Sequence, residues 1–295
     1  MDFLKQTAVE IGGGLGLGGG IRTLYRHLSI LYSPERAFKS SDVWLKDKVS
    51  EETLTATNRF TKNSVKIPLQ SVAPSLRRPS SVDCLDITEK SDFIITDTFP
   101  CIAEFLEDEK ILRSFQRNKR SWGDYIKRRQ GSVFFARKFD LSAPGTKLVS
   151  FFSGVPLVPG EFWLLSNLNL KYSKILTLWF NSTPNLIQMF LNRTETRGAW
   201  MKTDIKSLKE TYILDPRTLK REESDELLTL FDSIATSPFP SIIEQFRTAH
   251  STRKRIDEAI LEIVGFGKKE KENMLTRIYP ALFNEIEKLK TLMEG

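Results

Sequence analysis

The chain has 295 residues, of which 40% are hydrophobic, so it is long enough to bury a sizeable core in one large domain or two. Its formal net charge is +7, with 44 Lys and Arg residues against 37 Asp and Glu residues. This excess favours a polyanion or an acidic surface as partner and carries no information about the fold.

The chain contains two cysteines, Cys84 and Cys101, and two histidines, His27 and His250. These residues are too few for a disulfide framework or a zinc site, so we expect both cysteines to be reduced core thiols and no metal to bind. No stretch approaches the roughly 18 uninterrupted apolar residues of a membrane span. The N-terminal MDFLKQTAVE lacks the apolar region of a signal peptide. We therefore expect a soluble, cytoplasmic protein without a membrane partner.

Residues 11–21 form a glycine-rich run, IGGGLGLGGGI. No Gly-Lys-Ser/Thr follows it, which excludes a phosphate-binding P-loop. The run could instead be the S-adenosylmethionine loop of a methyltransferase, between a strand and a helix over 21–31, because glycines allow close backbone approach to a cofactor. Such an enzyme should also carry Asn/Asp-Pro-Pro-Tyr/Phe, and the chain has no Pro-Pro dipeptide. A packed turn between helices is the alternative, and we predict no cofactor site in this chain.

Residues 31–91 are polar and interrupted by prolines, with short strands expected over 64–69 and 82–87. Arg77 and Arg78 precede Pro79 in a small basic loop that is either solvated or in contact with phosphate. A strand is expected over 92–100, followed by a helix over 101–112.

Residues 110–129, KILRSFQRNKRSWGDYIKRR, hold eight Lys and Arg residues and one acid, Asp124, so this segment alone carries a charge of +7. Phe115 and two further aromatic residues interleave with the cations, a combination that suits phosphates and base stacking. The aromatic residues could instead pack into the core, and the cations could form a solvated helix face. The DNA contacts predicted here are Arg113, Arg117, Lys119, Arg120, Trp122, Tyr125, Lys127, Arg128 and Arg129.

Three strand-like runs follow at 132–139, 147–153 and 162–168, separated by Gly and Pro turns. Short strands and helices in mixed order predict the α+β class, with a mixed sheet-and-helix domain followed by a C-terminal helical segment.

Residues 171–191 place apolar side chains at helical spacing, with Ser173 as the expected N-cap. The run breaks at Asn181-Ser-Thr-Pro, and Pro184 fits the first turn of a second helix. A polar loop, NRTETRGAWMK, occupies residues 192–202, and a further helix is expected from Asp204 to Leu208.

This region resembles the target-recognition region of N6-adenine DNA methyltransferases of the restriction-modification type. The resemblance is carried by LWFNST at 178–183, RTETRGAWMK at 193–202 and Leu208-Lys209, and it continues with Asp215-Pro216 and with the segment from Phe239 to Asp257. It covers residues 160–257, and the order of the parts makes it specific. It implies binding to double-stranded DNA beside a methyltransferase catalytic domain or subunit that uses S-adenosylmethionine.

The loop chemistry agrees with that implication. Arg193 and Arg197 could contact a phosphate and a guanine edge, because the planar guanidinium fork matches guanine N7 and O6. Gly198 would let the backbone approach the DNA, and Lys202 could add a phosphate contact. The alternative is that Arg193 pairs internally to shape the loop. Trp200 is expected to be a core anchor.

The last part of the chain is expected to be helical after a short strand over 212–214. An acidic helix spans 222–234, and Ser241 with Glu244 forms a capping box. A heptad seam then predicts one long helix over 241–263 that could join a partner or an oligomer; its members are Ile242, Phe246, Ala249, Arg253, Ile256, Ile260 and Ile263. Pro280 should kink or restart the final helix over 268–293.

We find no nucleophile–base pair, nuclease acid cluster or methylation motif, so we do not expect this chain to be an enzyme by itself. The expected divisions are an N-terminal segment over 1–60, a target-recognition domain over 61–237 and a helical pair over 238–295. The predicted function is sequence-specific DNA binding as the target-recognition module or subunit of an adenine-specific methyltransferase system. The alternatives are a divergent S-adenosylmethionine-dependent methyltransferase using residues 12–20 and a helical scaffold subunit of a defence complex.

Overall fold

The computed structural model describes residues 8–9, 24–37, 42–80, 82–160, 162–165, 168–192, 198–203 and 211–294. The glycine-rich run at 11–21, the loop residues Arg193 and Arg197, and the expected helix over 204–208 lie outside these ranges.

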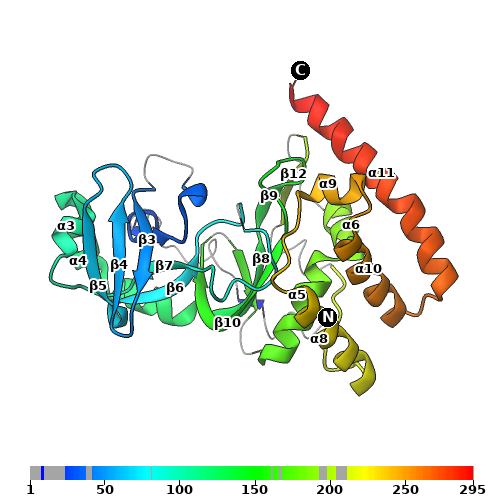
Figure 1. The fold of residues 1–295 in the computed structure, drawn as a ribbon, viewed down its shortest axis with the longest axis horizontal. Helices are drawn as coiled ribbons and strands as arrows, with labels where there is room; N and C mark the ends of the chain where they lie inside the picture. Colours follow the sequence, from blue (N-terminus) through cyan, green and yellow to red (C-terminus); the bar gives the residue numbers. More distant parts are fainter. Residues whose placement is uncertain are drawn as a thin grey trace.

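Within the described residues a ten-stranded sheet runs through the molecule in the order β1-β11-β8-β10-β6-β7-β2-β3-β4-β5 (Figure 1). The β6–β10 and β2–β3 pairs are parallel, and the other pairs are antiparallel. The strands are β1 (Ala8–Val9), β2 (Ser29–Leu31), β3 (Trp44–Val49), β4 (Thr53–Asn58), β5 (Ser64–Pro68), β6 (Val72–Leu76), β7 (Asp92–Ile95), β8 (Gly131–Ala136), β10 (Ser150–Pro159) and β11 (Phe162–Leu165).

A separate ribbon pairs two short strands, β9 (Lys138–Asp140) and β12 (Trp200–Lys202). The helices are α3 (Ile102–Leu106), α4 (Glu109–Arg128), α5 (Leu170–Asn181), α6 (Thr183–Leu191), α8 (Arg221–Ile234), α9 (Ile242–Arg247), α10 (Ser251–Ile263) and α11 (Lys268–Glu294). This mixture confirms the α+β class and the C-terminal helical segment.

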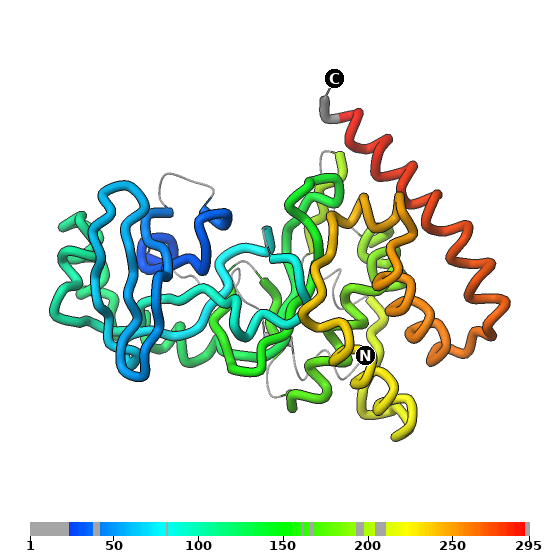
Figure 2. The backbone as a smooth tube through the Cα atoms, in the orientation of Figure 1, coloured from blue at the N-terminus to red at the C-terminus, as the bar shows by residue number. Residues whose placement is uncertain are grey.

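The chain forms two lobes, which the smooth backbone trace separates clearly (Figure 2). The left lobe holds β2 to β7 with α3 and α4, and the right lobe holds β8 to β12 with the remaining helices (Figure 1). Each lobe has its own cluster of buried apolar side chains. The parallel β6–β10 pair joins the lobes, with Ser75 opposite Val158 and Leu76 opposite Pro159.

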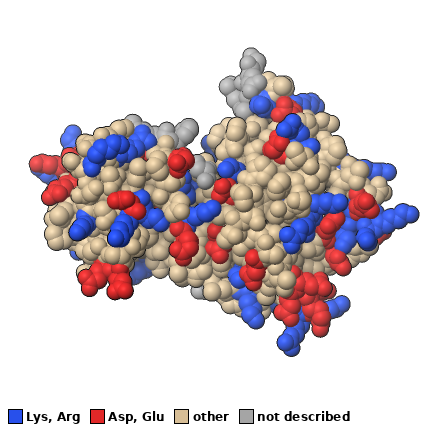
Figure 3. Space-filling model, viewed as in Figure 1, with Lys and Arg blue, Asp and Glu red and all other residues tan. Residues whose placement is uncertain are grey.

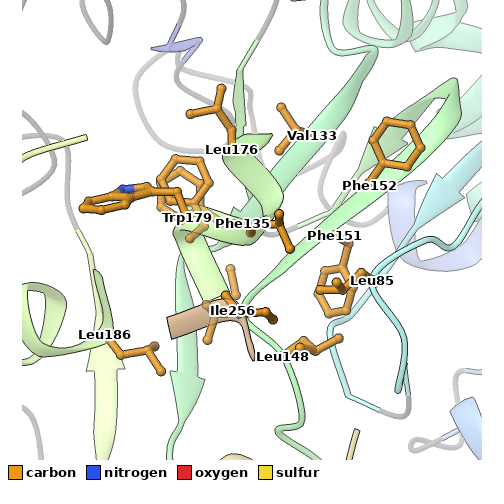
Figure 4. Close-up of a cluster of buried hydrophobic side chains, with 14 of the residues drawn as sticks. Leu85, Val133, Phe135, Leu148, Phe151, Phe152, Leu176, Trp179, Leu186 and Ile256 are labelled. Carbon is orange, nitrogen blue, oxygen red and sulfur yellow. The ribbon is translucent and has the colours of Figure 1, made fainter. Parts of the chain in front are cut away.

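Helix α5 covers the right-hand part of the sheet. Leu176 and Trp179 lie over side chains of β8, including Val133 and Phe135 (Figure 4). The ring of Phe180 stacks on Phe135 with their centroids 4.4 Å apart. Burial of each such side chain contributes about 1.5 to 3 kcal/mol, so α5 is fixed firmly on the sheet.

The predicted starts of α5 and α6 can be compared with the structure. α5 begins at Leu170, and its N-cap is Asn169, whose side chain accepts a hydrogen bond from Tyr172 N at 2.8 Å. Ser173 is buried inside the helix and donates to Asn169 O, so the prediction that it caps the helix is wrong. The prediction for Pro184 is confirmed, because it lies in the first turn of α6.

The expected long helix over 241–263 is also wrong, because it is broken into α9 and α10. Ala249 lies between them in the left-handed region, with φ of 47°. A non-glycine residue there ends a helix. Five members of the seam, namely Ile242, Phe246, Arg253, Ile256 and Ile260, are buried inside the chain and are not available as an oligomer interface, whereas Ala249 is exposed. By contrast, α11 continues through Pro280 without a new start.

The expected division after residue 60 falls in the turn between the paired strands β4 and β5. The division after residue 237 separates α8 from α9, and both helices contribute to the same buried cluster. Within the described ranges no helix combines the length and apolar character needed to cross a membrane.

A buried polar network joins the α5–α6 junction to the C-terminal helices. The carboxylate of Asp257 accepts hydrogen bonds from Thr183 N, the Thr183 hydroxyl and the Tyr279 hydroxyl, each at 2.6 Å. The Arg253 guanidinium donates to Gln245 Oε1 at 2.6 Å and to Asn181 O at 2.8 Å. All six residues are buried. Burial and the neighbouring carboxylate raise the pKa of Tyr279, so it stays a proton donor.

Asp257→Asn should destabilise the protein by about 1 to 3 kcal/mol, because the amide cannot accept all three hydrogen bonds that the buried Asp257 carboxyl group receives from Thr183 and Tyr279. The free energy of unfolding in urea measures the effect. Glu258→Gln is the matched control on the same helix: it removes an exposed partner of Lys254 and should change stability by less than about 1 kcal/mol. Equal free energies of unfolding for the two variants would contradict the proposed contribution of the buried network to stability.

Candidate nucleic-acid interface

Helix α4 has one buried face and one cationic face. Trp122 is fully buried, and its indole N–H donates to Ile95 O at 2.9 Å. Its ring stacks on Tyr125 with centroids 5.3 Å apart, and the buried Arg129 guanidinium lies 4.6 Å from the Tyr125 ring centroid. Trp122, Tyr125 and Arg129 are therefore core residues, and the prediction that they contact DNA is corrected. For the two aromatic residues, the alternative prediction, packing into the core, is the one that the structure supports.

The opposite face of α4 carries exposed cations at helical spacing, which we call the α4 stripe; its residues are Arg113, Arg117, Arg120, Lys127 and Arg128. Arg113 pairs with Glu109 at 2.7 Å, and Arg128 Nε donates to Asp124 O at 3.2 Å. Within the described ranges no ion pair holds the other three. The stripe spans about 22 Å, since a helix rises about 1.5 Å per residue.

Lys119 does not belong to the α4 stripe. Its ammonium group pairs with Asp97 at 2.6 Å on the flank of the helix. This pair lowers the pKa of the Asp97 carboxyl, chiefly through the hydrogen bond from Lys119. Lys119 is half-exposed in this pair, so it can still contribute positive charge beside the stripe.

The β9–β12 ribbon presents a second group of predicted residues. Trp200 pairs with Asp140 and Lys202 with Lys138, and these four side chains share the outer face. Trp200 is 38% exposed, and the Lys138 ammonium lies 4.9 Å from its ring centroid. The prediction of Trp200 as a core anchor is therefore wrong. Alternation along β12 turns Met201 into the core in its place.

The β9–β12 ladder continues beyond both ends of the ribbon, and the buried Phe139 and Met201 hold the ribbon on the right lobe. Thr203 N donates to Arg137 O at 3.0 Å, and Leu141 N donates to Ala199 O at 3.1 Å. The Trp163 indole N–H donates to the Thr203 hydroxyl at 3.0 Å. Gly198 precedes β12 with φ of 59°, a conformation that glycine adopts without strain. Trp200 and Lys202 therefore project from a rigid support.

The two arginines of the small basic loop ahead of Pro79 form internal ion pairs. The guanidinium groups of Arg77 and Arg78 both pair with the buried carboxylate of Asp42. Beside them Arg36 pairs with Asp92 at 2.8 Å. These charges stabilise the left lobe near its junction with β10, where Gly160 N donates to Leu76 O.

The predicted cations do not form one continuous patch. The α4 stripe belongs to the left lobe and the ribbon to the right lobe (Figure 1). On the face seen in Figure 3, basic and acidic side chains are intermixed. Lys138 was missed from the sequence because only the β9–β12 pairing places it beside Trp200. In the described ranges no cluster of His, Cys, Asp and Glu could hold a metal ion.

No protein-family model matches the chain, and no curated protein sequence matches it. Its fold is similar to that of a solved structure described as the type IIG restriction endonuclease BpuSI, with a TM-score of 0.53 and 13% sequence identity. The similarity covers 75% of this chain and 26% of that chain, so this chain spans about a quarter of the neighbour's length. At this identity the similarity shows a shared fold.

Trp200→Phe should remove most of the tryptophan fluorescence that iodide can quench, because the other four tryptophans are buried. Stern–Volmer titration with iodide measures the accessible fraction. Trp122→Phe should leave that fraction of the signal in place, since its ring is fully buried. Unchanged quenching in the Trp200 variant would contradict the exposed position of this ring.

Proposed function

We propose that this chain is the DNA-binding, target-recognition part of a restriction-modification enzyme. The observation that carries the proposal is the β9–β12 ribbon, a rigid element with an exposed tryptophan flanked by the exposed Lys138 and Lys202. The major groove of B-form DNA admits a two-stranded ribbon. Trp200 would contact bases or sugars there, while the two lysines would contact phosphates.

The loop ahead of the ribbon would supply base recognition in this proposal. Arg193 and Arg197 lie outside the described residues, and in the sequence Arg197 immediately precedes Gly198. A guanidinium bound to guanine N7 and O6 is a common base-specific contact. Phosphate contacts from the α4 stripe would add affinity that does not depend on sequence.

The fold similarity to part of a restriction endonuclease supports a role beside a catalytic unit, because this chain spans only about a quarter of that neighbour. We propose that methylation of adenine belongs to a partner domain or subunit that binds S-adenosylmethionine. The partner would flip the target adenine out of the helix, and this chain would hold the duplex and read its sequence.

Replacement of Arg117, Arg120 and Lys127 by Gln should weaken binding to all duplexes, because it removes up to three phosphate contacts. The slope of log K against log salt should become shallower by about 2 to 3. Fluorescence anisotropy with a labelled duplex at several salt concentrations measures both quantities. Replacement of Lys268, Lys269 and Arg277 by Gln is the matched control, since it removes the same charge from exposed positions of α11.

Two results would contradict the proposal. Absence of binding by the unaltered chain at low salt would exclude a DNA-binding function. Equal losses in the α4 variant and the α11 control would mean that net charge, and not the α4 stripe, attracts the DNA.

The ribbon should control sequence preference. Selection from a random duplex library would identify the preferred site of the unaltered chain. Trp200→Ala should then reduce the ratio of specific to non-specific affinity by about tenfold, because loss of a contact to a base edge typically costs about 1 to 3 kcal/mol of discrimination. Retention of the full ratio by this variant would remove the ribbon from the recognition surface.

A further inference from the structure

The turn between β4 and β5 presents an exposed aromatic ring between two cations. Phe60 is 55% exposed, although large apolar side chains usually seek burial. The Arg59 guanidinium carbon lies 4.4 Å from the centroid of the Phe60 ring. Lys62 follows two residues later and is exposed. The turn sequence, Arg-Phe-Thr-Lys-Asn over residues 59–63, contains no acid.

This turn is held rigidly from below by Asn58. The buried Asn58 Oδ1 accepts hydrogen bonds from Phe60 N at 2.9 Å and Thr61 N at 3.1 Å. Its Nδ2 donates to Glu107 Oε1 at 2.8 Å, which ties the turn to the corner between α3 and α4. Because the backbone of the turn is already ordered, a partner that contacts the ring would lose little conformational entropy in ordering it.

Lys62 completes the turn in a strained conformation. Its φ is 64°, a region that non-glycine residues rarely occupy. Its backbone N–H donates to Asn58 O at 2.9 Å, and its ammonium group donates to Arg59 O at 2.8 Å. Unusual backbone geometry of this kind is often found where a segment contacts a ligand.

The turn and the ribbon lie on the same side of the molecule. Leu69 N donates to Glu52 O, which fixes the β3–β4 turn at the opposite end of these strands. The β4–β5 turn therefore lies at the upper edge of the left lobe in Figure 1, and the β9–β12 ribbon lies at the upper side of the right lobe. Lys and Arg side chains gather along that upper edge of the left lobe in Figure 3.

We propose that the β4–β5 turn is a second DNA-contacting element, in which Phe60 inserts between two base pairs while Arg59 and Lys62 bind the flanking phosphates. This inference rests on the proposed function and extends it to a site in the other lobe. Apolar wedges of this kind partly unstack a base step and bend or unwind the duplex. The positive charge of the turn matches the phosphates on both sides of such a step.

Insertion of Phe60 changes the twist of DNA, so a plasmid-unwinding assay tests it with the full chain. The protein is bound to a closed circular plasmid, the plasmid is relaxed with a topoisomerase, and its topoisomers are resolved after protein removal. The unaltered chain should lower the linking number in proportion to its concentration. Phe60→Ala should abolish this shift and weaken duplex binding by about tenfold, whereas Phe60→Trp should retain both.

Val49→Ala is the matched control, because Val49 is an exposed apolar side chain at the opposite end of the same strands. It should unwind and bind DNA like the unaltered chain. If the unaltered chain binds DNA without unwinding it, or if Phe60→Ala unwinds it normally, insertion by Phe60 is overturned while the proposed function stands. If the unaltered chain binds no DNA, both proposals are overturned.

Discussion

The buried bridge between Thr183, Arg253 and Asp257 is the constraint on which the right lobe depends. Polar groups without solvent must find partners, and here those partners come from α5, α6, α9, α10 and α11 together. Asn181 extends the same network to the sheet, since its side chain accepts from Val149 N and Ser150 N. The network thereby sets the position of α5 on the start of β10, the strand that pairs with β8. β8 continues through one residue into β9, so the ribbon inherits its orientation from this buried bridge.

The proposed function involves elements of both lobes, so a duplex could be contacted at two separated places instead of at one basic patch. The sheet passes from one lobe to the other through the parallel β6–β10 pair, so elements of both lobes are carried on one hydrogen-bonded framework. The ribbon on one lobe and the β4–β5 turn on the other lie on the same side (Figure 1). Each presents an aromatic ring beside cations on a rigid support. A duplex in contact with both would be held at two separated points, and this would resist rotation better than one patch of charge.

The aromatic residues show where interpretation of the sequence succeeded and where it failed. The cations around Trp122 predict a DNA contact, yet this ring is buried. The apolar neighbours of Trp200 predict a core position, yet this ring is exposed. Both positions obey local periodicity. Phe115, Trp122 and Tyr125 fall on one side of a 3.6-residue helix, and Trp200 alternates with the buried Met201 along a strand. The many cations near Trp122 suggest an exposed position for this ring, whereas its helical spacing from Phe115 and Tyr125 suggests a buried one. The spacing is the better guide, because a cationic surface helix needs a buried face as much as any other surface helix does.

The α+β class, the break at Asn181 to Pro184 and the helical character of the C-terminal segment could be predicted from the sequence, because these features follow from local spacing, capping and turn chemistry. The extent of α4 was not predicted, since the expected helix covered only residues 101–112. Which cations are exposed depends on how the elements pack against one another. Arg77 and Arg253 are buried beside partners that are distant in sequence or lie on another element, and Arg129 is buried over the ring of Tyr125. No local pattern distinguishes these three from the exposed Arg117 and Arg120. Likewise, Lys138 and Trp200 meet only because β9 pairs with β12 across some sixty residues of chain. Local sequence patterns indicate which helices and strands form. The burial of a side chain and the pairing of strands depend on contacts between elements that are far apart in the sequence, and local patterns do not reveal these contacts.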